Sequence, residues 1–154
     1  MIIRKLNKAH VAEASQLIEQ VSNKYTLDDF TERGYQNFKS KVLNEGMVKN
    51  LEDGFMYWGA FEEEVMVGLI AIKLPAHLYN LFVHTDYQKK GIATRLWQHM
   101  LSHLNPESLT LFSSSHAIGL YQKLGFEQSG EKIDNDEIIC YPMLWKMSKD
   151  SRNK

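Results

Sequence analysis

Residues 77–104 of the chain read HLYNLFVHTDYQKKGIATRLWQHMLSHL. They begin with a nearly continuous apolar and aromatic run, residues 78–83, which is typical of a strand that is buried on both faces. The pair Thr85-Asp86 has the chemistry of a turn. Beyond the turn, apolar residues recur at the spacing of a helix face, namely at Leu96, Trp97, Met100, Leu101 and Leu104. The stretch therefore predicts a buried strand, a tight turn and an amphipathic helix.

The start of this predicted helix has the features of an anion-binding site. A helix that follows directly after a buried strand points free backbone N–H groups and the positive end of its dipole at the strand's carboxyl edge, where phosphate commonly binds. Gly91 has no Cβ, so a ligand can approach the backbone there, and Ala93 is nearly as small. Lys89 and Lys90 add positive charge. We therefore predict that residues 88–94 bind a phosphate group.

A second segment, residues 113–126, follows another apolar strand predicted over residues 109–112. Serines at the start of the segment can cap a helix. The apolar residues of that helix share one face; they are Ala117, Leu120, Tyr121 and Leu124. Gly125 is a natural residue for the helix end. The segment predicts a strand, a capping turn and a short helix.

The two segments resemble two motifs of the GCN5-related N-acetyltransferase (GNAT) superfamily. The first motif is the acyl-coenzyme A signature Gln/Arg-x-x-Gly-x-Gly/Ala, which stands here as Gln88, Gly91 and Ala93. The second is a helix that carries alanine and tyrosine and ends in Gly-Phe, here with Ala117 and Tyr121. The motifs occur in the family's order, and the resemblance covers roughly residues 55–147. The N-terminal third is similar only in its order of elements.

The resemblance implies a mixed α/β fold with a twisted, mostly antiparallel sheet of six or seven strands and about four helices. Its central strands, residues 78–83 and 109–112, should be parallel and splayed. The length of 154 residues suits one domain, residues 1–154, with a frayed tail at 148–154. Further strands are predicted over residues 2–6, 55–61, 65–73 and 138–145, and helices over residues 7–21 and 30–43.

Three local signals refine these elements. Ser22-Asn23 is expected to end the first helix, and Gly34 interrupts the pattern of the second. Pro142 lies inside the last strand, and because proline cannot donate to a sheet ladder, it indicates a sheet edge or a bulge. An edge strand of this kind leaves a homodimer possible.

The composition narrows the class of protein. Hydrophobic residues make up 44% and charged residues 24%, which is ordinary for a globular protein. The net charge of −1 gives no support for bulk electrostatic binding to nucleic acid or to an anionic membrane. Cys140 is the only cysteine, the N-terminus has no signal-peptide pattern, and no apolar run approaches the ~20 residues of a membrane helix. We therefore expect a cytoplasmic protein.

By resemblance, the reaction is transfer of an acetyl group from acetyl-coenzyme A, as co-substrate, to a primary amine of a small molecule or peptide, without a metal. The pantetheine amides would pair with backbone groups of the central strand, and the Val83 N–H would stabilise charge on the thioester carbonyl. The residues expected to bind acetyl-coenzyme A are Leu81, Phe82, Val83, Gln88, Lys89, Lys90, Gly91, Ile92, Ala93, Thr94, Ser114, Ala117 and Tyr121.

Three residues are candidates for moving protons. Tyr121 matches the family's tyrosine that protonates the leaving thiolate, and its other interpretation is core packing. His77 falls where the superfamily often places a catalytic base, and an imidazole with an ordinary pKa near 6.5 suits that role. Tyr79 is a second candidate for the base or a residue that holds water. His84 and His116 lie in predicted turns and are interpreted as surface residues.

One position departs from the family pattern, and one alternative function stays open. Many relatives carry asparagine three residues before the motif alanine, whereas this chain has Ser114, whose hydroxyl can replace one amide contact to the cofactor. The alternative is a catalytically silent acyl-coenzyme A-binding module that acts as a sensor or scaffold. A P-loop nucleotide enzyme is excluded, because the chain contains no Gly-x-x-x-x-Gly-Lys-Ser/Thr.

Overall fold

The computed structural model describes residues 1–148, so the predicted frayed tail lies outside the described residues from 149 onward. An eight-stranded sheet has the order β1-β2-β3-β4-β5-β8-β6, and β7 also pairs with β8. The strands are β1 (Ile2–Lys5), β2 (Met56–Glu62), β3 (Val65–Lys73), β4 (His77–Val83), β5 (Ser108–Ser113), β6 (Glu127–Gln128), β7 (Ile133–Asp134) and β8 (Ile139–Lys146). Only the central pair, β4 and β5, is parallel. The predicted mixed fold is confirmed, but the sheet has eight strands instead of six or seven.

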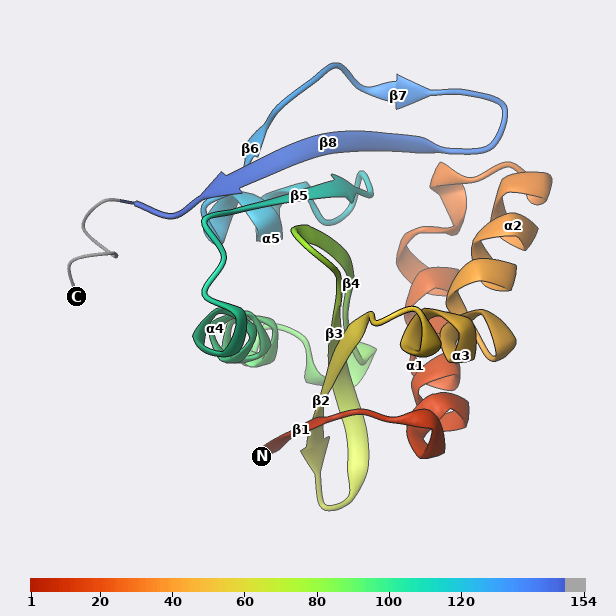
Figure 1. The fold of residues 1–154 in the computed structure, drawn as a ribbon. Coiled ribbons are helices and arrows are strands. Elements are labelled where there is room, and N and C mark those ends of the chain that lie inside the picture. Colours follow the sequence, from red (N-terminus) through yellow and green to blue (C-terminus); the bar gives the residue numbers. More distant parts are fainter. Residues whose placement is uncertain (149–154) are drawn as a thin grey trace.

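Helices cover both faces of the β1–β4 part of the sheet (Figure 1). Helices α1, α2 and α3 lie on one face and α4 on the other, while α5 lies below β5. Their bounds are α1 (Val11–Tyr25), α2 (Glu32–Val42), α3 (Glu45–Glu52), α4 (Ile92–Leu104) and α5 (Ile118–Lys123), with 3-10 turns η1 (Lys8–His10), η2 (Leu27–Asp29) and η3 (Thr85–Tyr87). Helix α3 was not predicted from the sequence.

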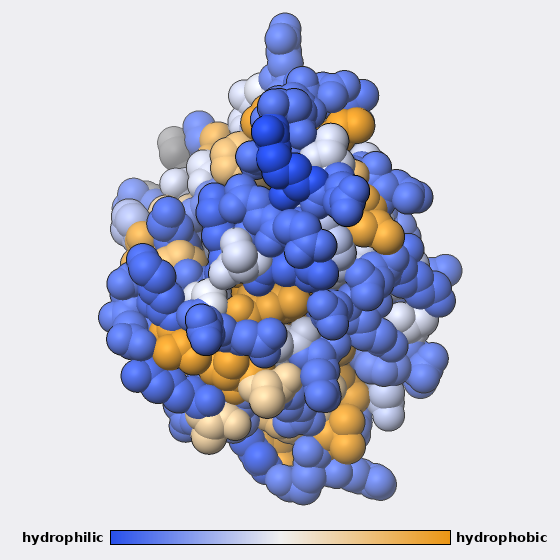
Figure 2. Space-filling view, turned by 90° about the vertical axis from the view of Figure 1, so that its right-hand side faces the viewer, coloured by the Kyte–Doolittle hydropathy of each residue, from blue (hydrophilic) through white to orange (hydrophobic). Residues whose placement is uncertain are grey.

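The two helix layers produce two hydrophobic clusters that share the sheet. Along β3, Val67 and Ile70 belong to the cluster under α4, whereas Met66 and Leu69 belong to the cluster under α1. A strand that is covered on both faces needs an unbroken apolar sequence. The outer face of the α1–α3 layer is mostly hydrophilic, with apolar residues showing only in patches (Figure 2). Because amphipathic helices cover both faces of this sheet, the apolar patterns of its helices and strands are pronounced in the sequence.

The central strands touch at only one register pair. His77 of β4 pairs with Thr110 of β5, and the Thr110 N–H donates to the Ala76 carbonyl at 2.9 Å. Beyond this point the strands diverge, and β5 and β8 run across the direction of β2–β4 (Figure 1). The expected splayed parallel pair is therefore present, and it opens the sheet at its centre.

Pro142 lies in an interior strand, so the expectation of an edge strand is wrong. Strand β8 has β5 on one side and β6 and β7 on the other. The Ser129 N–H donates to the Pro142 carbonyl at 2.9 Å, so the backbone of Pro142 faces the β6 side. The ladder on that side is interrupted between the pairs Met143–Gln128 and Cys140–Ile133. The missing proline N–H consequently costs no ladder hydrogen bond.

Two expected helix breaks are also absent. Helix α1 continues through Ser22 to Tyr25, because the buried Ser22 hydroxyl is satisfied by the Tyr35 hydroxyl at 3.0 Å and the Glu19 carbonyl at 3.3 Å. Gly34 lies inside α2 and is buried. A Cβ at Gly34 would stand 1.9 Å from the Glu137 carbonyl oxygen. Glycine at this position thus permits close contact between α2 and the chain before β8.

We expect Gly34→Ala to lower the free energy of unfolding by about 2 kcal/mol, because overpacking against a backbone atom outweighs the gain in helix propensity. The control is Gly119→Ala in α5, where an added Cβ meets nothing within 4 Å. That change should raise stability by ~0.5 kcal/mol through the unfolded state. Urea unfolding followed by circular dichroism measures both. Equal stability of Gly34→Ala and the unmodified protein would contradict the close contact.

Candidate active site

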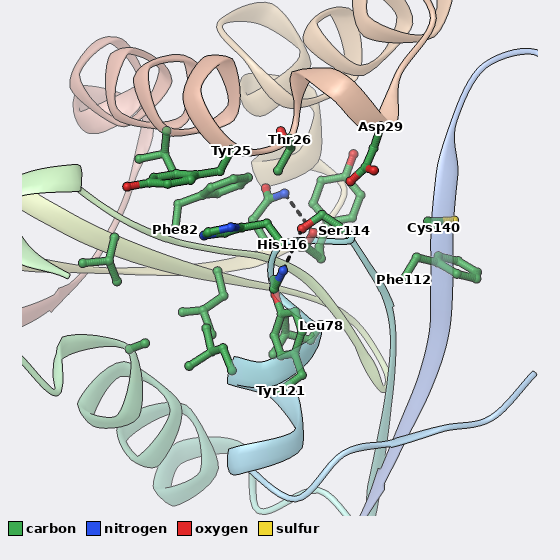
Figure 3. A pocket seen from close by; sticks show the side chains of 18 of the residues that line it. Tyr25, Thr26, Asp29, Leu78, Phe82, Phe112, Ser114, His116, Tyr121 and Cys140 are labelled. Carbon is green, nitrogen blue, oxygen red and sulfur yellow. Dashed lines mark hydrogen bonds between the residues drawn. The ribbon is translucent and has the colours of Figure 1, made fainter. Parts of the chain in front are cut away.

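A cavity of about 960 Å³ opens where β4 and β5 diverge. Its walls come from α1, η2 and α2 on one side and from the starts of α4 and α5 on the other (Figure 3). The structure brings almost all of the predicted site residues together in its lining: His77, Tyr79, Leu81, Phe82, Val83, Gln88, Lys89, Gly91, Ile92, Ala93, Thr94, Ser114, Ala117 and Tyr121. Lys90 does not line the cavity, and its Nζ lies 5.3 Å from the centre of the Tyr87 ring.

One end of the cavity meets the N-terminus of α4. Gly91 is the N-cap residue and has φ +82°, a left-handed conformation that favours glycine. A Cβ at Gly91 would meet nothing within 4 Å, so the space in front of the helix is open. The first N–H groups of an α-helix have no intrahelical acceptor, and here those of Ile92, Ala93 and Thr94 belong to residues that line this space. The end of the cavity fits an anionic group such as a pyrophosphate.

The cleft side of β4 presents backbone groups for hydrogen bonding. The His84 N–H donates to the Val67 carbonyl on the β3 side. Because successive residues of a strand point their backbone groups to opposite sides, those of Val83 and Leu81 face the gap toward β5. The Gln88 side chain donates to the Val83 carbonyl at 3.0 Å, which fixes the end of the strand. The N–H groups of Leu81 and Val83 fit amide-bearing ligands that lie along the strand.

Asn80 supplies a buried acceptor that the sequence analysis missed. Its side chain is only 6% exposed, and its Nδ2 donates to the Tyr79 carbonyl at 2.8 Å. Within residues 1–148, its Oδ1 is buried without a hydrogen-bond partner, and Asn80 lines the cavity. An unpaired buried carbonyl costs ~1–3 kcal/mol, so this atom fits a ligand that carries N–H groups. The sequence signal that could have identified it is a single polar residue inside an otherwise apolar strand.

The surroundings of His77 favour the neutral form of its imidazole. Its Nδ1 lies 2.8 Å from the Thr110 Oγ1, and its ring lies 5.4 Å from that of Phe112. Burial, and to a smaller extent the charge of Lys73, lower the pKa of His77 below 6.5. The Thr110 hydroxyl can donate to the Ala76 carbonyl at 3.5 Å, and in that arrangement it accepts the Nδ1–H. The Nε2 then carries the lone pair that a base requires.

The two tyrosines differ in their surroundings. Tyr121 packs against Phe126 at 5.7 Å in the α4 cluster, and burial raises its pKa well above 10. Tyr121 is buried and lines the cavity. Tyr79 contacts Phe55 edge-on at 4.9 Å on the α1 side, and burial raises its pKa as well. Both phenols stay protonated near pH 7.

A β-bulge explains why alternation along β4 is broken. Asn80 pairs with Ala71 and Leu78 with Ile72, so Tyr79 is an extra residue in β4. As a result, Leu78 and Leu81, three residues apart, both lie in the α4 cluster. The bulge turns the side chains of β4 at the point where the strand lines the cavity. The two-residue alternation of a regular strand cannot predict this bulge.

A lip formed by residues 26–38 covers the far side of the cavity. Asp29 accepts hydrogen bonds from the Ser115 hydroxyl at 2.6 Å and from the Ser115 N–H at 2.9 Å. Phe30 forms an isolated bridge with Ile138, which connects the lip to the start of β8. The lip is therefore tied both to the β5–α5 loop and to the β7–β8 segment. These long-range contacts left no pattern in the sequence.

His116 is exposed, as predicted, and it also lines the cavity. Its ring stacks on that of Tyr25 at 4.3 Å and 18°, as Figure 3 shows. His84 does not line the cavity; its Nδ1 accepts from the Asp86 N–H at 3.1 Å. The Ser114 hydroxyl accepts from the Ala117 N–H at 3.2 Å, just before α5. Other lining residues that the sequence analysis missed are Asn37, Phe38, Lys41, Phe112, Glu137 and Cys140.

No helix within residues 1–148 combines the length and the apolar character that a membrane span requires. Over the same residues, no three side chains of His, Cys, Asp or Glu are grouped so that they could hold a metal ion.

Solved structures with the same fold include several acetyltransferases. A GCN5-related N-acetyltransferase from Rhodopseudomonas palustris is 20% identical with a TM-score of 0.79, covering 95% of each chain. The PaiA N-acetyltransferase from Thermoplasma acidophilum, solved with coenzyme A, is 18% identical with a TM-score of 0.77, covering 96% of this chain and 100% of that one. The ribosomal-protein-S18-alanine N-acetyltransferase from Escherichia coli is 20% identical with a TM-score of 0.63, covering 96% of this chain and 94% of that one.

A comparison with curated proteins gives no match to the sequence. The model of the acetyltransferase (GNAT) domain family, by contrast, matches residues 26–147. These residues contain the splayed central pair, the N-terminus of α4 and every predicted site residue. Because the match covers most of the chain, the protein belongs to the GNAT family of N-acetyltransferases.

Proposed function

We propose that the protein transfers the acetyl group of acetyl-coenzyme A to a primary amine. The observation that carries the proposal is the cleft between β4 and β5, which leads from the open N-terminus of α4 to His77 and Tyr121. Among the structural neighbours, the ribosomal-protein-S18-alanine N-acetyltransferase from Escherichia coli supports an amine acceptor. The proposal includes no metal, nucleic acid or membrane partner. A cytoplasmic location and a homodimer stay predictions.

Acetyl-coenzyme A, when bound, supplies an activated thioester. In our proposal the N–H groups of Ile92, Ala93 and Thr94 hold the pyrophosphate, with the charge of Lys89 nearby. The N–H groups of Leu81 and Val83 hold the amide-bearing arm, and that of Val83 also faces the thioester carbonyl. Asn80 Oδ1 accepts an N–H of the arm and so gains the partner that it lacks in the described residues. Gln88 keeps β4 in position through the Val83 carbonyl.

The proton path uses two groups whose pKa values the fold shifts, His77 and Tyr121. His77, with a pKa below 6.5, is neutral near pH 7 and accepts a proton from the ammonium form of the acceptor. The free amine can then attack the thioester. Tyr121, with a pKa well above 10, is protonated and donates to the sulfur that leaves. Tyr79 lines the same cavity and is proposed to hold a water molecule between the amine and His77.

A panel of amines tests the reaction itself. Each amine is incubated with acetyl-coenzyme A, free thiol is measured, and the acetylated product is identified by mass spectrometry. Thiol release that depends on the amine, together with an N-acetylated product, is the expected result. Binding of acetyl-coenzyme A without any amine-dependent release would favour the silent sensor or scaffold over the enzyme.

His77→Ala should change the pH dependence of the reaction. In the unmodified protein, the rate should fall as the pH drops through the His77 pKa, which lies below 6.5, because the protonated imidazole is no base. The variant should lose ~10²-fold at pH 7 and recover part of it as the pH rises toward the amine's own pKa. The control is His99→Ala on α4, whose ring lies outside the cavity. A pH profile of kcat/KM that is parallel in the variant and the unmodified protein would exclude His77 as the base.

A further inference from the structure

The acceptor half of the cavity is rich in aromatic side chains. We define it as the lining residues within segments 21–42 and 137–140. Tyr25, Phe30 and Phe38 line this half, and Phe30 and Phe38 contact each other at 5.1 Å. Strands β4 and β5 add Tyr79, Phe82 and Phe112 beside it. A cavity wall of this kind favours an apolar or aromatic ligand.

Part of this aromatic surface, at Phe112, is exposed to solvent. Phe112 is 59% exposed, and it lines the cavity together with Cys140 on β8 (Figure 3). Cys140 is itself buried, and burial together with the charge of Asp29 raises the pKa of its thiol. The thiol is therefore neutral and adds no charge to the wall. An exposed ring beside a neutral buried side chain fits an apolar group of a ligand.

The acceptor half carries little charge for a ligand to pair with. Its charged side chains are Asp29, Lys41 and Glu137, so one ammonium stands against two carboxylates. Both oxygens of Asp29 already accept hydrogen bonds from Ser115, at 2.6 and 2.9 Å. Glu137 Oε2 accepts from Asn37 Nδ2 at 3.2 Å, and its Oε1 lies 3.9 Å from Arg33 Nε. A ligand with several ammonium groups would find no set of free carboxylates here.

The ties of the lip also limit the size of the ligand. The lip is fixed to the β5–α5 loop by Asp29 and to β8 by the Phe30–Ile138 bridge. The Thr31 N–H adds a hydrogen bond to the Glu137 carbonyl at 3.0 Å. An extended peptide would need an open groove at one of these two sides. The closed sides favour a small molecule.

We infer that the acceptor is a small monoamine whose amino group is carried on an aromatic body, as in an arylalkylamine. This inference rests on the proposed acetyl transfer to amines. The ring would pack against the aromatic wall of the acceptor half, which directs the single amino group toward His77 on β4. In this arrangement, the lip and its aromatic neighbours select the acceptor, and charged side chains do not.

The test compares kcat/KM for four acceptors at a saturating concentration of acetyl-coenzyme A. These are 2-phenylethylamine, n-butylamine, spermidine and a short peptide with a free amino terminus. Burial of the ring should favour 2-phenylethylamine over n-butylamine by roughly 10- to 100-fold. Spermidine and the peptide should be poorer acceptors than 2-phenylethylamine. The acetylated products are identified by mass spectrometry.

A pair of variants connects the preference to the wall. Phe112→Ala should reduce the ratio of 2-phenylethylamine to n-butylamine by roughly 3- to 10-fold, and because Phe112 is exposed, the protein should fold normally. Leu74→Ala removes a side chain that is 49% exposed and lies outside the cavity, so the ratio should not change.

The outcomes separate this inference from the proposed function. If n-butylamine, spermidine or the peptide equals or exceeds 2-phenylethylamine, amine acetylation stands and the inference is overturned. If the ratio of kcat/KM for 2-phenylethylamine to that for n-butylamine is unchanged in Phe112→Ala, the proposed role of the aromatic wall is contradicted. If no amine releases thiol although acetyl-coenzyme A binds, the proposed function fails first, and the inference fails with it.

Discussion

Gly91→Glu should abolish measurable binding of acetyl-coenzyme A, raising Kd by at least ~100-fold. The new side chain would enter the open space in front of α4, where a Cβ meets no other atom within 4 Å. Its carboxylate would then stand where the pyrophosphate is expected. Two like charges about 4 Å apart near a protein surface repel by ~4 kcal/mol, and 1.4 kcal/mol corresponds to a factor of ten in affinity. Isothermal titration calorimetry measures the loss.

The matched control for this change is Gly54→Glu. Gly54 also has a positive φ, +92°, and open space around its Cβ position, but it lies in the turn before β2 and outside the cavity. Both variants carry the same left-handed strain and the same added charge. Gly54→Glu should bind acetyl-coenzyme A with unchanged affinity. If both variants bind equally well, the pyrophosphate does not lie at α4.

Tyr121→Phe should lower kcat by ~10²- to 10³-fold, with little change in the affinity for acetyl-coenzyme A. The reason is the loss of the proton donor to the leaving sulfur, while the ring and its contact with Phe126 are kept. Because burial holds the Tyr121 pKa well above 10, the phenol is protonated across pH 6–9, and the loss should be the same throughout that range. This flat profile differs from the pH-dependent loss expected for His77→Ala.

Tyr57→Phe is the control for the Tyr121 change. Tyr57 is also buried, and burial raises its pKa to about 12, but it lies outside the cavity and its hydroxyl accepts a hydrogen bond from Asn50 Nδ2 at 3.2 Å. Removing its hydroxyl should affect stability and leave kcat unchanged. A loss of less than about threefold in Tyr121→Phe would indicate that positioning and ordered water carry the reaction.

The end of the cavity at the N-terminus of α4 was predictable because its signals are local. A buried strand, a turn and an amphipathic helix leave separate periodicities in the sequence, and Gly91 marks the helix start by its freedom to adopt φ +82°. These elements are close in sequence, so short-range patterns were sufficient to place them. The parallel contact with β5, by contrast, was implied by the resemblance to the GNAT superfamily.

The acceptor end was not predictable in the same way. Asp29 and Ser115 lie 86 residues apart in the chain, and nothing in either neighbourhood indicates their hydrogen bonds. Gly34 was taken as a helix break, because only the tertiary contact with Glu137 shows why glycine occurs inside α2. His116 is exposed as predicted, but its stacking on Tyr25 of α1 could not be predicted from either neighbourhood in the sequence.

The one-pair contact between β4 and β5 has a consequence for cooperativity. Antiparallel ladders connect β1–β4 to one another and β5–β8 to one another. Between these two blocks, the backbone ladder consists of the His77–Thr110 pair. A ligand that bonds to the cleft edge of β4 and packs against α5 would bridge the two blocks in the manner of an additional strand. Substrate binding would then join two cooperative units into one, and the amides at the centre of the sheet would become its most slowly exchanging protons.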